Sequence, residues 1–151
     1  MVGNSAAILN GVPVLTQDID FYVRPTTLNR RKIAAAARNL GPYVSVLTNP
    51  PLSEITRLAG WVAPVDFIVT VGGGKSFESI RSRASKYPGV DGRIWVASLA
   101  DVIAMKKAAN RPKDRAVMGI LEQTLKLKQA TGGTVAERRV HWKRPPTRRR
   151  R

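Results

Sequence analysis

Thiol and imidazole groups are almost missing from this sequence. It contains no cysteine and a single histidine, His141. The lack of cysteine excludes a disulfide framework, a thiolate-bound zinc or iron–sulfur site and a cysteine nucleophile. One histidine in a basic C-terminal segment argues against a Ser-His-Asp triad and against a multi-histidine metal site. The remaining candidates for chemistry are carboxylates, hydroxyls and basic side chains.

Long apolar runs are missing as well. No uncharged apolar stretch reaches the roughly 18 residues that a membrane-spanning helix needs. The first eleven residues also lack the basic segment of a signal peptide. We therefore expect a cytoplasmic protein with no membrane partner. With 151 residues and a hydrophobic content of 43%, the chain is long enough for one globular domain with a modest core.

Acidic residues are scarce. Asp and Glu number 10 against 26 Lys and Arg, which gives a formal net charge of +16. Half of this excess lies in the last 14 residues, which hold 8 basic residues and no acid. Blocks of like charge repel themselves and stay disordered unless bound, so we expect a folded domain over residues 1–135 and a disordered basic tail over 136–151. The tail either contacts a polyanion, with RNA or DNA ahead of a membrane surface, or only keeps the protein in solution. Its candidate contacts are Arg138, Arg139, Lys143, Arg144, Arg148, Arg149, Arg150 and Arg151.

Strand and helix patterns alternate along the chain and predict an α/β fold with a small mixed sheet flanked by helices. The expected strands are Asp18–Val23, Tyr43–Leu47, Val65–Val71 and Arg93–Ala97. The expected helices are Ser5–Asn10, Thr26–Leu40, Leu52–Leu58, Ser76–Ala84, Ser98–Ala109 and a last one that starts at Pro112 and ends at the glycines 132 and 133. Residues 87–92 predict a loop. The glycine-rich stretch Val71–Ser76 predicts a turn rather than a Walker loop, because position 69 lacks the first glycine of that motif.

Asp18 and Asp20 form the sharpest local pattern. Residues two apart in a strand point to the same face, which puts these carboxylates about 6–7 Å apart. Two such charges beside an apolar core are costly unless a cation compensates them. Asp66 begins a second apolar strand, and if the two strands are neighbours the three acids meet at one site. Oxygen ligands of this kind suit Mg²⁺, although the same acids could instead cap strand ends and face water.

Two further features involve groups that can bind phosphate. Gly3, Asn4 and Ser5 precede or open a short helix, where unpaired N–H groups favour an anion, and the Ser5 hydroxyl could cap the helix or contact a phosphate oxygen. Lys106 follows Val102 and Ile103 by four and three residues, so we expect it on their apolar face, pointing inward. Lys107 should point to solvent. The other interpretation of Lys106 is a lysine whose stem passes the edge of the core to reach water.

Together, the Gly3-Asn4-Ser5 turn, the Asp18-Ile19-Asp20 strand and Asp66 resemble the nucleotidyltransferase superfamily. This superfamily includes minimal nucleotidyltransferases, aminoglycoside nucleotidyltransferases and toxins of bacterial toxin–antitoxin systems. The stretch from Ser98 to Val117, SLADVIAMKKAANRPKDRAV, is similar to a lysine-bearing helix and an Arg-x-Lys-Asp segment of many bacterial members. The sequence departs from the family pattern at Asn4, where Gly or Ser is more common, and at Val117, where an acid often stands.

The resemblance implies a mixed sheet flanked by helices and the transfer of a nucleoside monophosphate from an NTP such as ATP to an acceptor hydroxyl, with release of pyrophosphate. It implies that Asp18, Asp20 and Asp66 hold Mg²⁺, as a pair of ions, and that Asp66 acts as general base. Gly3, Asn4 and Ser5 would hold the triphosphate, and Lys106 would contact its phosphates. The acceptor would be RNA, with tRNA attractive because of the positive charge, and a toxin of this kind would have a cognate antitoxin.

Two alternatives stay open at this point. The chain could be a noncatalytic nucleic-acid-binding module of the same fold, or it could modify a small molecule, as aminoglycoside nucleotidyltransferases do. A pure nucleic-acid binder, however, has no reason to place three carboxylates beside a polyanion.

Overall fold

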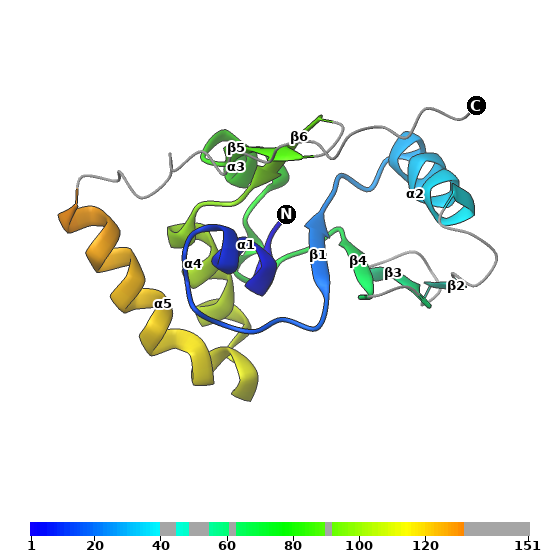
Figure 1. The fold of residues 1–151 in the computed structure, drawn as a ribbon. Coiled ribbons are helices and arrows are strands. Elements are labelled where there is room, and N and C mark those ends of the chain that lie inside the picture. Colours follow the sequence, from blue (N-terminus) through cyan, green and yellow to red (C-terminus); the bar gives the residue numbers. More distant parts are fainter. Residues whose placement is uncertain (40–44, 49–54, 61–62, 90–91, 132–151) are drawn as a thin grey trace, which may run out of the picture.

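The computed structural model describes residues 1–39, 45–48, 55–60, 63–89 and 92–131 (Figure 1). It is a mixed α/β structure, as the sequence predicts. Its elements, in chain order, are α1 (Gly3–Leu9), β1 (Ile19–Tyr22), α2 (Thr27–Asn39), β2 (Ser45–Thr48), β3 (Ile55–Ala59), β4 (Val65–Ile68), the 3₁₀ turn η1 (Gly72–Gly74), α3 (Phe77–Ser82), β5 (Ser85–Gly89), β6 (Gly92–Val96), α4 (Leu99–Ala109) and α5 (Pro112–Ala130).

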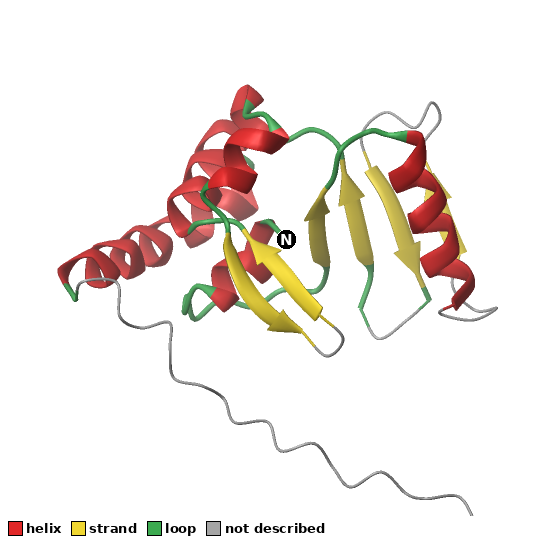
Figure 2. Cartoon of the chain, turned by 90° about the horizontal axis from the view of Figure 1, so that it is seen from above, coloured by secondary structure: helices red, strands yellow, loops and turns green. Residues whose placement is uncertain are grey.

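A four-stranded mixed sheet carries the strand order β1-β4-β3-β2. β1 and β4 are parallel, whereas β4 and β3, and β3 and β2, are antiparallel. β5 and β6 form a separate antiparallel pair. Figure 2 shows α2 lying against the four-stranded sheet, with the other helices gathered on its β1 side.

Two sequence predictions of local structure are wrong. The helix expected over Leu52–Leu58 is strand β3 at residues 55–59, because these residues pair with β4 on one side and β2 on the other; residues 52–54 lie outside the described part. The loop expected over residues 87–92 is shorter, because Ser85–Gly89 form strand β5 against β6. In both cases the pairing partner, which a local pattern does not reveal, decides the conformation.

The side-chain alternation of β1 and β4 separates an apolar face from an acidic one. Ile19, Phe21, Val65 and Phe67 pack with the helix residues Ile33 and Ala37 in a small core beneath α2. The rings of Phe21 and Phe67 stack with their centroids 5.7 Å apart. Because successive strand residues point to opposite faces, Asp20 and Asp66 lie on the face away from α2.

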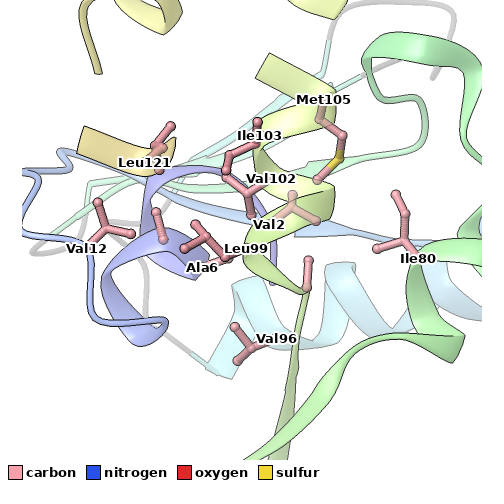
Figure 3. Close-up of a cluster of buried hydrophobic side chains, with 12 residues drawn as sticks. Val2, Ala6, Val12, Ile80, Val96, Leu99, Val102, Ile103, Met105 and Leu121 are labelled. Carbon is pink, nitrogen blue, oxygen red and sulfur yellow. The ribbon is translucent and has the colours of Figure 1, made fainter. Parts of the chain in front are cut away.

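The larger core lies beyond that acidic face and fixes α1 and α4 beside the sheet (Figure 3). Ala6 and Ala7 of α1, Val102 of α4 and Leu121 of α5 are fully buried there. Because the side chains of Ala6 and Ala7 are small, α1 can pack closely against α4. The Ser98 hydroxyl caps α4 by accepting the Asp101 N–H at 3.1 Å, and the helix follows over Leu99–Ala109, where the sequence predicts one.

An ion-pair cluster around Asp101 joins η1 and α3 to the start of α4. The Asp101 carboxylate accepts hydrogen bonds from Lys75 Nζ at 2.9 Å, from Arg83 Nη2 at 2.7 Å and from the Ser98 hydroxyl at 2.7 Å. Gly72 lies so close to α4 that an added Cβ would be 2.7 Å from the Met105 carbonyl oxygen. The glycine turn after β4 is therefore tightly packed, and only a residue without a side chain fits at position 72.

Candidate functional site

The three acids singled out in the sequence converge. In the parallel β1–β4 pair, Asp20 lies directly opposite Asp66, and Asp18 immediately precedes β1. Each of the three residues offers a carboxylate oxygen within 4.8 Å of the others. Asp66 is buried, while Asp18 and Asp20 are partly buried. We call these three residues the acid cluster; it could hold a metal ion.

Arg57 forms ion pairs with the acid cluster, and it is not among the site residues expected from the sequence. Position 57 of β3 lies opposite Asp66 in the antiparallel β3–β4 pair. Its Nε donates to Asp66 Oδ1 at 2.7 Å and its Nη2 donates to Asp66 Oδ2 at 2.6 Å. Nη2 is also 3.7 Å from Asp18 Oδ2. The hydrogen bonds to Asp66 raise the pKa of Arg57 further above its ordinary value, so the guanidinium stays charged.

The electrostatics of the cluster favour a cation. Burial raises the pKa of Asp20 from 3.8 to about 6, and the charges of Asp18 and Asp66 add to the rise. Lys113 and Lys106 oppose it from across the site. A bound divalent cation would lower the free energy of the ionised cluster, because it would offset both the lost hydration and the mutual repulsion of the carboxylates.

A cavity of about 400 Å³ opens beside the acid cluster. The acids line the wall that the sheet contributes, and α4 with the start of α5 contributes the opposite wall. Cations from three elements also line this cavity; they are Arg57, Lys106, Arg111 and Lys113. One side of the cavity therefore suits a metal ion and the other suits an anionic group.

Lys106 points inward as the sequence predicts, and its neighbour Lys107 is exposed. Lys106 Nζ donates to Asp114 Oδ1 at 2.9 Å, and Asp114 is completely buried. Arg111 Nε donates to the other carboxylate oxygen of Asp114 at 2.6 Å. Burial alone would raise the pKa of Asp114, but hydrogen bonds from Arg111 and Lys106 outweigh it and lower that pKa. Asp114 thus fixes two of the cations that line the cavity.

Gly3, Asn4 and Ser5 have three different placements. Gly3 has a φ of +65° and lies against the Asp20 carboxylate. Asn4 lines the cavity; its Oδ1 is buried and, within the described part of the chain, accepts no hydrogen bond. Ser5 is buried within α1, and its hydroxyl donates to the Asp18 carbonyl oxygen at 2.9 Å. The Ser5 side chain therefore holds the backbone of a cluster residue instead of capping the helix.

No protein-family model matches the chain, and no curated protein is significantly similar to it. Within the residues that the structure describes, no helix combines the length and the apolar character needed to cross a bilayer. The basic residues predicted to contact nucleic acid all lie outside the described residues; they are Arg138, Arg139, Lys143, Arg144, Arg148, Arg149, Arg150 and Arg151.

The donor set fits a hard divalent cation. Two carboxylates from adjacent strands, and a third from the residue before β1, supply oxygen ligands, which Mg²⁺ prefers over nitrogen or sulfur. Asn4, which lines the same cavity, has a buried Oδ1 that accepts no hydrogen bond from the described residues, so one acceptor of this lining residue remains unused.

Proposed function

We propose that this chain is a Mg²⁺-dependent nucleotidyltransferase, which moves a nucleoside monophosphate from an NTP to an acceptor hydroxyl. One observation carries the proposal: three carboxylates meet in a cavity whose other wall carries Lys106, Arg111 and Lys113. A nucleoside triphosphate with Mg²⁺ presents the complementary charges, because the metal needs oxygen ligands and the phosphates need cations.

Asp18, Asp20 and Asp66 would hold the metal. When bound, Mg²⁺ would neutralise phosphate charge and stabilise the charge that develops on the leaving pyrophosphate. The side chains contribute orientation: Ser5 fixes the Asp18 carbonyl, and the Val2 N–H donates to the Asp20 carbonyl oxygen at 2.9 Å. Both carboxylates thus extend from a backbone that α1 holds in place.

The cations on α4 and α5 would bind the triphosphate. Lys106 and Arg111 share Asp114 as a buried anchor, so their charged ends keep a fixed position at the cavity wall. Fixed charges stabilise a transition state better than mobile ones, because no reorganisation is needed when charge develops. Lys113, which is exposed, adds a further positive charge at the same wall.

Asp66 would act as the general base. A carboxylate oxygen of Asp66 takes the proton of the acceptor hydroxyl, and the hydroxyl oxygen forms a bond to the α-phosphorus. The bond from that phosphorus to the pyrophosphate oxygen breaks, and pyrophosphate leaves with the electron pair. Asp66 suits this role because it is buried on a central strand, which fixes its position; one of its two hydrogen bonds from Arg57 must open before that oxygen takes the proton.

We propose RNA, and tRNA in particular, as the acceptor. The net charge of +16 favours a polyanion. Helix α2, which covers the face of the sheet opposite the acids, adds exposed basic side chains, which are Arg30, Arg31, Lys32 and Arg38. The cognate antitoxin expected of a toxin-type member remains a prediction from the sequence.

The experiment is a transfer assay with each of the four α-labelled NTPs, Mg²⁺ and total RNA. We expect label on RNA, dependent on Mg²⁺ and lost in Asp18→Asn and in Asp20→Asn. Glu78→Gln is the matched control, because it removes one acidic charge at an exposed pair with Arg24, away from the cavity. If no NTP is transferred while wild type and variants bind RNA equally, the chain is a noncatalytic binder. If label appears on an aminoglycoside and not on RNA, the acceptor class is wrong.

A further inference from the structure

Arg57 holds a position that the proposed reaction does not explain. Of the cations in the described ranges, Arg57 is the one that forms an ion pair with the acid cluster. Its Nε and Nη2 each donate a hydrogen bond to a different carboxylate oxygen of Asp66, and Nη2 also lies 3.7 Å from Asp18 Oδ2. The guanidinium therefore already neutralises part of the charge that would attract a metal ion.

A divalent cation and the Arg57 guanidinium would bind the same carboxylate oxygens of Asp66. Mg²⁺ and Mn²⁺ bind carboxylate oxygens at short range and demand a defined ligand geometry. Both oxygens of Asp66 are engaged by Arg57 at 2.6–2.7 Å. Asp66 can give an oxygen to a metal, or later accept a proton, once the fork has opened on at least one side.

The burial of the two partners indicates which one moves. The Asp66 side chain is 7% exposed, whereas the Arg57 side chain is 41% exposed. Asp66 stands on β4 between two paired strands, so its position is fixed by the sheet. Arg57 has a long side chain with an open path into the cavity that it lines. Lys106 contrasts with it, because its side chain is 10% exposed and is bonded to a fully buried acid.

We infer that Arg57 is a resident counter-ion that gates metal loading of the acid cluster. It neutralises Asp66 and Asp18 before the metal binds, and the metal binds by displacing it. The displaced guanidinium stays in the cavity, so the site gains the metal without losing its arginine. The inference rests on the proposed function for the role of the metal, but it concerns the affinity of the cluster for the ion and is measured without a nucleotide.

The test is a calorimetric titration of the full chain with Mn²⁺ alone. Arg57→Met removes the competitor, so we expect Mn²⁺ to bind about fivefold more tightly than to the wild type, the ratio expected for loss of a partly exposed ion pair. Arg57→Lys keeps the charge but loses the fork, and its affinity should lie between the two. Arg24→Met is the matched control: it removes an arginine from an exposed pair with Glu78, lowers the net charge equally and should leave Mn²⁺ affinity unchanged.

A second measurement covers the case in which Arg57→Met fails to fold. In the ¹⁵N spectrum of the wild type, the Arg57 Nε–H signal, assigned by its loss in Arg57→Lys, should leave its position in the ion pair with Asp66 as diamagnetic Mg²⁺ saturates the protein. A signal that stays in place at saturation overturns the inference.

The direction in which Arg57→Met changes the Mn²⁺ affinity distinguishes a competing counter-ion from a purely structural role for Arg57. If Arg57 only holds Asp66 in place for the metal, Arg57→Met binds Mn²⁺ more weakly or equally, and the gate is wrong. The two proposals also fail separately. If Arg57→Met binds Mn²⁺ more tightly but the wild type transfers no nucleotide, the role of Arg57 is supported and the proposed enzyme activity is wrong. If the wild type transfers nucleotide but Arg57→Met has an unchanged Mn²⁺ affinity, the enzyme activity is supported and the role of Arg57 is wrong.

Discussion

Gly3 and Asp20 are in contact: a Cβ added to Gly3 would lie 3.0 Å from Asp20 Cγ and closer still to Oδ2, nearer than real Cβ atoms approach a neighbour. The φ of +65° at Gly3 is a left-handed conformation that L side chains rarely adopt. The sequence places a glycine at the start of α1 for two reasons, the backbone conformation and the space that the carboxylate needs.

Replacing Gly3 by alanine should therefore disturb the acid cluster directly. We expect Gly3→Ala to cost about 1–2 kcal/mol in unfolding free energy from backbone strain, and also to weaken Mn²⁺ binding, because the Asp20 carboxylate must move. Gly11→Ala is the control, since Gly11 has a φ of +88° but nothing within 4 Å of the added Cβ. Equal Mn²⁺ affinity in both variants would contradict the contact. Calorimetry and thermal melting measure the two effects.

The two neighbouring lysines of α4 provide a second test. Lys106 pairs with the fully buried Asp114, whereas Lys107 pairs with Glu122 at 2.6 Å on the surface. Asp114→Asn leaves a buried positive charge without its counter-ion, so we expect a loss of about 3 kcal/mol in urea unfolding. Glu122→Gln should cost less than about 1 kcal/mol. Similar losses in the two variants would mean that Asp114 is not the anchor described above.

Asp20 should make the protein less stable as the pH rises. Because its pKa is raised from 3.8 to about 6 in the folded state, the ionised form costs folding free energy above pH 6 and nothing below pH 4. We therefore expect Asp20→Asn to be more stable than the wild type at pH 8, by about 1–2 kcal/mol after allowance for solvent screening, and equal to it near pH 4. Urea unfolding at the two pH values measures this.

Glu78 serves as the control for this prediction, because its pKa is lowered in the folded state whereas that of Asp20 is raised. Arg24 lowers the pKa of Glu78, so Glu78→Gln should bring no stabilisation at pH 8. Added Mg²⁺ should raise the melting temperature of the wild type and have a smaller effect on Asp20→Asn, because the metal relieves the repulsion that the substitution removes. A stability difference that does not change between pH 4 and pH 8 would contradict the raised pKa.

The basic tail should account for much of any RNA affinity. Removing residues 138–151 deletes 8 positive charges. Each phosphate that the tail neutralises contributes about 0.7 to the slope of log affinity against log salt for single strands. We expect the truncated chain to show a slope smaller by several units and an unchanged melting temperature. A full-length variant with serine at the eight basic positions controls for chain length, and an unchanged slope in both would assign the tail to solubility alone.

Some of the site follows from local pattern. The spacing of Asp18 and Asp20 predicts both on one strand face whatever the strand pairs with, because side chains alternate. The position of Lys106 after Val102 and Ile103 sets its inward direction in the same way, since residues three and four apart share a helix face. Lys106 is buried, as expected. The two aspartates share the cavity, although strand β1 begins at Ile19 and Asp18 lies in the bend before it, so strand alternation does not place Asp18.

Other parts needed the tertiary structure. Residues 52–58 carry an apolar spacing that fits a short helix, so the sequence does not point to Arg57, which forms ion pairs with Asp66 and Asp18. The stretch Ile55-Thr56-Arg57-Leu58 has no strict polar–apolar alternation, and its only local indication of a strand is the pair of β-branched residues Ile55 and Thr56. Ser5 likewise fits a phosphate contact by sequence, but the fold directs its hydroxyl to the Asp18 carbonyl oxygen.

Where the type of element was predicted correctly, as for β4 and α4, the sequence by itself determined which face is polar and which is apolar, because those faces follow from periods of two and of 3.6 residues along the chain. Only the tertiary structure decided that Asp66 of β4 has Asp20 of β1 opposite it on one side and Arg57 of β3 opposite it on the other. Every residue but proline offers the same backbone hydrogen-bonding groups, so backbone pairing does not distinguish one partner strand from another. Which segments pair, and in which register, depends on how the apolar faces of distant segments pack together in the fold.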